Sequence, residues 1–153
     1  GERMDQTLQK CTELGASAFQ PVWSERVEVR LKGEKLEKRQ VHWQSVVVSA
    51  CEQSGRAVVP EVRPAMGLLD WLARPPVGDR LVLMPGAGRS LAGRAVPKAI
   101  ELLTGPEGGF SETALAAMSA AGVNPVSLGP RILRTETAAP AAVSVLQALM
   151  GDF

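Results

Sequence analysis

Aromatic residues are scarce in this sequence of 153 residues, which has no tyrosine, three phenylalanines and three tryptophans. Proteins that bind single-stranded nucleic acid by stacking need several aromatic side chains, so this composition argues against a base-stacking platform. The formal net charge of +1 is also low for a domain that holds nucleic acid alone, since such domains are usually strongly basic. If the protein acts on RNA, its cations must be clustered or another domain must contribute to binding.

Cysteine and histidine are equally rare. Cys11 and Cys51 form no CxxC pair and are too far apart to suggest a disulfide framework, so we expect two buried, reduced thiols. His42 is the single histidine and has no paired cysteines, which argues against a zinc site or any other metal. We expect its side chain on a helix surface or satisfied by a hydrogen bond.

Long hydrophobic runs are absent as well. No apolar run reaches the roughly 18 residues that span a bilayer, and residues 1–5 lack the apolar stretch of a signal peptide. We therefore expect a cytoplasmic protein without membrane contact. Its hydrophobic fraction of 45% is enough to bury the core of one domain. No repeat or internal boundary divides the sequence, so we predict a single domain over residues 1–153.

Hydrophobic periodicity predicts helices alternating with strands. The predicted helices cover residues 5–14, 41–54, 66–73, 112–121 and 137–150, and the predicted strands cover residues 18–23, 80–84, 99–103 and 125–128. Pro60 and Pro64 bracket an extended linker. Pro140 falls in the first turn of the last predicted helix, where its missing N–H has no intrahelical partner. This alternation is typical of an α/β fold with a mainly parallel sheet.

Three predicted strands end in loops rich in glycine and proline, at residues 84–88, 104–109 and 128–131. In parallel α/β sheets ligands bind beyond the carboxyl ends of the strands. Glycines let the backbone approach a ligand closely, and free backbone groups there could read an adenine edge and a ribose. Tight turns without a ligand are the alternative for any one loop. Three such loops on successive strands favour a ligand site.

The first of these loops contains Gly86 and Gly88 and partly resembles a phosphate-binding loop. It lacks the Lys-Ser/Thr ending of a Walker loop and the third glycine of a GxGxxG motif. An ordinary flexible loop is the simpler interpretation. A nucleotide-binding enzyme that uses this loop stays open as an alternative function.

The segment 128–137 carries two arginines and a glutamate next to a predicted helix start. Charged groups are costly to bury unpaired, so they predict either a functional site or a set of ion pairs. In the structural alternative, Arg134 pairs with Glu136 or Glu107 and holds the loops together.

Two segments, 102–111 (LLTGPEGGFS) and 128–138 (LGPRILRTETA), resemble the paired signatures of the 16S ribosomal RNA (uracil-N3) methyltransferase family, within the SPOUT superfamily. Segments 9–15, 24–26, 50–56 and 151–153 also match the pattern of that family. The resemblance covers essentially the whole chain. Several long motifs in the same order are far more specific than one glycine loop.

The resemblance implies a parallel-sheet SPOUT fold with a C-terminal trefoil knot, an S-adenosylmethionine site inside the knot, and a homodimer acting on 16S RNA of the small ribosomal subunit. Family members usually begin with a small β-barrel RNA-binding domain, whose pattern is not found in these residues, so RNA affinity is the property most affected. The cofactor contacts implied by the motifs are Leu83, Pro85, Thr104, Gly105, Glu107, Gly109, Leu128, Gly129, Ile132, Leu133 and Arg134.

Methylation of uracil N3 requires that its proton leave, because the protonated nitrogen is a poor nucleophile. A carboxylate could accept the proton, and an arginine could stabilise charge developing on O2 or O4. We therefore expect Arg134 to stabilise the negative charge on the uracil oxygens and Glu107 or Glu136 to act as the general base. The same glutamates could instead stabilise helix N-termini.

For RNA contact, the charge-dense segment 25–39 is the candidate. Its cations alternate with four glutamates, so a solvated face is the alternative to a phosphate-binding track. The six cations are Arg26, Arg30, Lys32, Lys35, Lys38 and Arg39. For the chain as a whole, a non-catalytic RNA-binding or assembly module is the remaining alternative.

Overall fold

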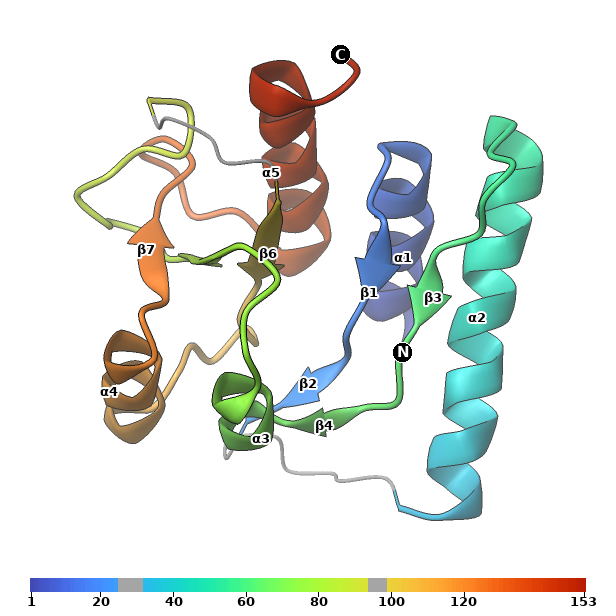
Figure 1. The fold of residues 1–153 in the computed structure, drawn as a ribbon, viewed down its shortest axis with the longest axis horizontal. Coiled ribbons are helices and arrows are strands. Elements are labelled where there is room, and N and C mark those ends of the chain that lie inside the picture. Colours follow the sequence, from blue (N-terminus) through green and yellow to red (C-terminus); the bar gives the residue numbers. More distant parts are fainter. Residues whose placement is uncertain (25–31, 94–98) are drawn as a thin grey trace.

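The computed structural model describes residues 1–24, 32–93 and 99–153 (Figure 1). Its helices are α1 (Glu2–Glu13), α2 (Glu34–Ser54), α3 (Leu68–Ala73), α4 (Glu112–Ala120) and α5 (Thr135–Met150). Its strands are β1 (Ala18–Phe19), β2 (Val22–Trp23), β3 (Glu61–Val62), β4 (Met66–Gly67), β5 (Asp79–Leu83), β6 (Ile100–Leu103) and β7 (Asn124–Val126). The predicted α/β class is confirmed.

Every strand pair in the described ranges is parallel, as predicted. The main sheet has the order β6-β5-β7, and two short pairs, β1-β3 and β2-β4, lie beside it. In the main sheet Leu81 of β5 is opposite Leu102 of β6 and Asn124 of β7. Because β5 is central and covered on both faces, it consists of an apolar run rather than an alternating pattern.

The two faces of β5 belong to two different cores. Leu81 packs with Leu91, Val126 and Ala142 of α5, whereas its neighbour Val82 packs with side chains of α3 and α4. Successive residues of a strand point to opposite faces of the sheet. The main sheet is therefore sandwiched between α5 on one face and α3 with α4 on the other.

Helix α1 joins this sandwich to the rest of the molecule, since it lies between α2 and α5 (Figure 1). Two side chains satisfy backbone carbonyls at its C-terminal end, which no helix can satisfy internally. Gln147 Nε2 of α5 donates to the carbonyl of Leu14 at 2.8 Å. Arg56 donates to the carbonyls of Thr12 and Ala16, both at 2.8 Å. The end of α1 is thus fixed from two sides.

The placement of Pro140 in a first helical turn is wrong. Arg134 is the N-cap residue of α5, so the helix begins at Thr135 and Pro140 lies inside it. A proline at this position removes the N–H that would bond to the carbonyl of Glu136, four residues earlier. The prediction started the helix too late because Thr135 and Glu136 are polar and carry no periodicity signal.

The predicted start of α2 at residue 41 is also wrong, because the helix begins at Glu34. Its first turns are charged and contain few apolar residues, so periodicity alone misses them. Charged pairs four residues apart stabilise such turns, and Lys38 Nζ lies 2.8 Å from Glu34 Oε1. Two further boundaries shift: residues 66 and 67 form β4 instead of a helical turn, and the predicted strand 18–23 is split into β1 and β2.

Both cysteines are free and buried, as predicted. Burial raises the pKa of the Cys11 thiol from 9.0 to about 12, because a thiolate is poorly solvated inside the protein. The expectation for His42 is confirmed too, since its Nε2 lies 2.7 Å from Asp5 Oδ2 on an exposed face of α2. No helix in the described ranges is long and apolar enough to cross a membrane.

The raised pKa of Cys11 predicts a loss of stability at alkaline pH. Between pH 9 and pH 12 the unfolded chain gives up the thiol proton while the native chain keeps it. This contribution to the free energy of unfolding is complete below pH 9 and falls by about 1.4 kcal/mol per pH unit above it. Urea unfolding from pH 7 upward should show a steeper decline for the wild type than for Cys11→Ala. Parallel declines would contradict the prediction.

Candidate ligand site at the carboxyl edge of the sheet

The three glycine-rich loops lie together at one edge of the main sheet. Strands β5, β6 and β7 are parallel neighbours, so their carboxyl ends share that edge. We call these loops L5 (residues 84–91), L6 (residues 104–111) and L7 (residues 127–134), after the strands that they follow. The arrangement predicted from the sequence is confirmed.

Each loop contains one glycine in the left-handed backbone region. The φ angles are 77° at Gly86, 71° at Gly109 and 66° at Gly129. A Cβ atom added at any of these three positions would meet no atom within 4 Å. Glycine is therefore required by the backbone conformation and not by crowding, and the main chain at these turns is open to an approaching ligand.

Hydrogen bonds connect L7, together with Thr135 that follows it, to L5 and L6. The Ser127 N–H donates to the carbonyl of Arg89 at 2.9 Å, and the Leu91 N–H donates back to the carbonyl of Ser127 at 3.0 Å. At the other end of L7, Thr135 Oγ1 donates to the carbonyl of Gly105 in L6 at 3.4 Å. These bonds make the three loops one connected surface.

Apolar side chains border this surface. Leu83 and Leu128 are half-buried against the core between the sheet and α5, and Leu133 is half-buried as well. Ile132 projects into solvent with an exposure of 83%. Of the other implied contacts, Thr104 and Gly105 are half-buried, whereas Pro85 is exposed. The edge thus combines open backbone with apolar side chains, as sites for small organic ligands commonly do.

The charged residues at this edge are placed differently from one another. Arg134 is exposed at the N-cap of α5, and none of the ion pairs between described residues includes it. Glu107 of L6 pairs with Arg3 of α1. Glu136 is half-buried in the first turn of α5, and its Oε2 is buried without a hydrogen-bond partner in the described structure. The pairing of Arg134 with either glutamate is therefore not observed.

Arg3 is the site residue that the sequence did not reveal. Its contact with Glu107 joins α1, at the start of the chain, to a loop far away in the sequence. No spacing or motif signals such a pair, because the contact depends on α1 lying beside α5. Only the tertiary structure shows it.

The structure describes only some of the predicted RNA-binding cations. Arg26 and Arg30 lie outside the described residues. Lys35 and Lys38 are exposed on the first turns of α2, and Arg39 is half-buried. The pairing of Lys38 with Glu34 is typical of a solvated helix face.

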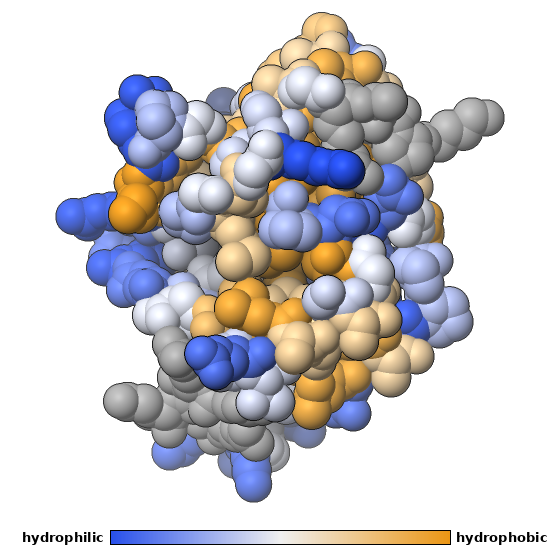
Figure 2. Space-filling model, turned by 90° about the vertical axis from the view of Figure 1, so that its left-hand side faces the viewer, coloured by the Kyte–Doolittle hydropathy of each residue, from blue (hydrophilic) through white to orange (hydrophobic). Residues whose placement is uncertain are grey.

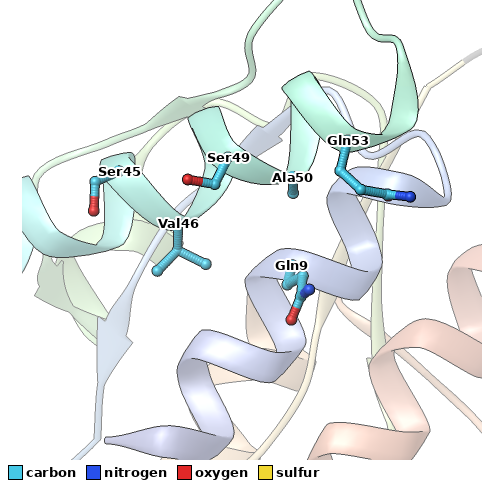
Figure 3. Close-up of a pocket in the computed structure, with 6 residues that line it drawn as sticks. All are labelled: Gln9, Ser45, Val46, Ser49, Ala50 and Gln53. Carbon is cyan, nitrogen blue, oxygen red and sulfur yellow. The ribbon is translucent and has the colours of Figure 1, made fainter.

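Two hollows in the surface lie away from the loops. One has a volume of about 230 Å³ and lies between α1 and α2 (Figure 3); its lining residues are all neutral, namely Gln9, Ser45, Val46, Ser49, Ala50 and Gln53. The other, of about 190 Å³, includes Gly78 and Asp79 at the amino end of β5. No group of three or more His, Cys, Asp or Glu side chains in the described ranges could hold a metal ion.

Comparisons with known proteins agree on one family. A family model described as an RNA methyltransferase domain matches residues 1–147. Ribosomal RNA small subunit methyltransferase E of Buchnera aphidicola subsp. Schizaphis graminum is 37% identical over 155 residues, which cover 99% of this chain and 62% of that protein. The chain spans 50% to 65% of the length of four such curated relatives.

Solved structures give the same picture. The crystal structure of ribosomal RNA small subunit methyltransferase E from Neisseria gonorrhoeae, bound to S-adenosylmethionine, is 47% identical with a TM-score of 0.91 and covers 97% of this chain and 62% of that one. A Legionella pneumophila protein in complex with the same cofactor is 40% identical with a TM-score of 0.93, over 100% of this chain and 64% of that one. Because the family model matches nearly all of its length, this chain belongs to the RNA methyltransferase domain family.

Proposed function

We propose that residues 1–153 are the catalytic domain of an S-adenosylmethionine-dependent methyltransferase that modifies N3 of a uridine in 16S RNA, in the cytoplasm. The observation that carries the proposal is the meeting of L5, L6 and L7 at one sheet edge. It is supported by two relatives of closely similar fold that were solved with S-adenosylmethionine.

The residues at this edge fit such a cofactor. Open main chain at Gly86, Gly109 and Gly129 can bond a ribose and an adenine edge, and Leu83 and Leu128 offer apolar surface to the rings. When bound, the cofactor supplies an electrophilic methyl group. The contacts proposed are Leu83, Pro85, Thr104, Gly105, Glu107, Gly109, Leu128, Gly129, Ile132, Leu133 and Arg134.

Of the two candidate bases, the surroundings favour Glu136. The Glu107 carboxylate is already paired with Arg3. Glu136 Oε2 has no hydrogen-bond partner in the described structure, so this carboxylate has an oxygen that no other group occupies. In this proposal the proton of uracil N3 moves to the carboxylate of Glu136, whose side chain is half-buried.

Arg134 is suited to the charge that this proton transfer creates. Loss of the N3 proton places negative charge on uracil O2 and O4, and an arginine can donate several N–H bonds to such oxygens. The Arg134 guanidinium is exposed and has no ion-pair partner among the described residues. It is therefore free to turn toward a bound base.

Methyl transfer to small ribosomal subunits lacking the modification tests this function. With labelled S-adenosylmethionine, label should enter 16S RNA as N3-methyluridine, identified by mass spectrometry of the digested RNA. Cofactor binding without transfer, under conditions in which the small-subunit RNA is bound, would favour the non-catalytic RNA-binding module. A rise in melting temperature with ATP or NAD, and none with S-adenosylmethionine, would favour the nucleotide-binding enzyme that uses the loop with Gly86 and Gly88.

The proposal includes two further structural features, a trefoil knot in the C-terminal part of the chain and a homodimer. Apolar residues gather at the top of Figure 2, at the C-terminal end of α5. Leu149, Met150 and Phe153 are 42%, 37% and 65% exposed there, and exposed apolar patches commonly mark protein interfaces. This end of α5 is the surface that we expect a second copy to cover.

If the cations of α2 bind RNA phosphates, neutralising them should change the salt dependence of binding. The triple variant Lys35→Ala, Lys38→Ala, Arg39→Ala should bind small-subunit RNA more weakly. Its slope of log affinity against log salt should be shallower, by up to about 0.9 for each phosphate that the protein no longer neutralises. Filter binding at several salt concentrations measures this slope. An unchanged slope would leave the solvated face as the correct interpretation.

A further inference from the structure

Three side-chain contacts tie α1, L6 and α5 into a closed ring. Arg3 in the first turn of α1 pairs with Glu107 of L6. Thr135 in the first turn of α5 donates to the carbonyl of Gly105 in L6. Gln147 in the last turn of α5 donates to the carbonyl of Leu14, next to the end of α1. Each of the three elements is thus bonded to the other two.

Within this ring, L6 is the element with the most backbone freedom, because glycines occupy positions 105, 108 and 109. Two local contacts restrain it, one between Gly105 and Phe110 and one that closes a turn around Glu107 and Gly108. The Phe110 ring lies so close to Gly105 that an added Cβ would come within 2.7 Å of it, and the Gly109 N–H donates to the carbonyl of Pro106 at 2.9 Å. Glu107 lies inside this turn, and its side chain is the point at which Arg3 holds the loop from outside.

We infer that Arg3 is a positioning residue, which holds L6 in its cofactor-binding conformation through Glu107. The inference rests on the proposed function, since it assumes that L6 contacts the cofactor. Arg3 itself reaches the loop edge from α1 and acts only through the carboxylate that it pairs with. A loop fixed before the ligand arrives loses less entropy on binding, so this contact raises affinity without touching the reacting atoms.

The size of the effect follows from the exposure of the pair. The side chains of Arg3 and Glu107 are 52% and 58% exposed, and such pairs contribute about 0.2–1 kcal/mol. Converted to affinity, this corresponds to a change of about 1.4- to 5-fold in the dissociation constant of the cofactor. The effect is also sensitive to salt, because an exposed pair is screened at high ionic strength.

Calorimetric titration of the chain with S-adenosylmethionine tests the inference. In Arg3→Ala the dissociation constant should rise about 1.4- to 5-fold at low salt, and Arg3→Lys should restore most of the loss. In methyl-transfer assays the KM for the cofactor should follow while kcat stays the same. The matched control is Lys10→Ala, which removes the same charge from an exposed position of α1 and should bind like the wild type.

Each other outcome has a definite meaning. If the wild type binds the cofactor and Arg3→Ala binds it equally well, the positioning role is wrong while the proposed function stands. An equal loss in Lys10→Ala would also overturn the role, since it would show a general effect of charge. If the wild type does not bind S-adenosylmethionine at all, the proposed function fails and this inference fails with it.

Discussion

Replacing Arg134 by alanine should lower kcat for methyl transfer by about 10²- to 10³-fold, the usual cost of removing one donor that stabilises developing negative charge. The side chain is exposed, and no described residue pairs with it, so its loss should not disturb the fold. The main chain of L7 stays in place, and the dissociation constant of S-adenosylmethionine should therefore change by only a few-fold. Single-turnover assays and calorimetry measure the two quantities separately.

The matched control for this variant is Arg131→Ala, which removes the same charge from an exposed position of the same loop. Its kcat should stay within a few-fold of the wild type. Full turnover in Arg134→Ala, with cofactor affinity unchanged, would show that the electrostatic role assigned to this arginine is wrong. An equal loss in both variants would instead indicate a general need for positive charge at L7.

The substitution Glu136→Gln should reduce kcat by about 10²- to 10⁴-fold, the range over which a positioned general base accelerates a reaction. Glutamine keeps the size of the side chain but cannot accept a proton from uracil N3. The buried Oε2 of Glu136 lacks a partner among the described residues, so the substitution breaks no hydrogen bond there. Rapid-quench measurement of one turnover isolates this step from product release.

Glu107→Gln separates the two candidate bases. Because Glu107 is paired with Arg3, we expect its loss to raise the KM for the cofactor and to leave most of kcat. The reverse result, a large loss of kcat in Glu107→Gln and little change in Glu136→Gln, would transfer the role of base to L6.

The sequence carried enough information to predict that the three glycine-rich loops meet at one edge of the sheet. Strand β5 is buried on both faces, so it appears as an apolar run that needs no periodicity to be recognised. Gly86, Gly109 and Gly129 adopt backbone conformations that few other residues tolerate, which is why the loops are visible as glycine-rich segments. Parallel strands then bring the loops together at one edge.

Other features could not be predicted because neither hydrophobic periodicity nor a motif marks them. Strands β1 to β4 have two residues each, which is too short for an alternating pattern to appear. The first turns of α2 are stabilised by charged pairs such as Lys38 with Glu34, and the hydrophobic pattern does not record them. The contact of Arg3 with Glu107 exists only once α1, L6 and α5 have assembled.

The most direct test of the account is the position of S-adenosylmethionine in a crystal of this chain soaked with the cofactor. We predict electron density in contact with all three loops, beside Gly86, Gly105 and Gly129. Density in the hollow lined by Gln9 and Ser49 instead, or at the amino end of β5, would contradict the account.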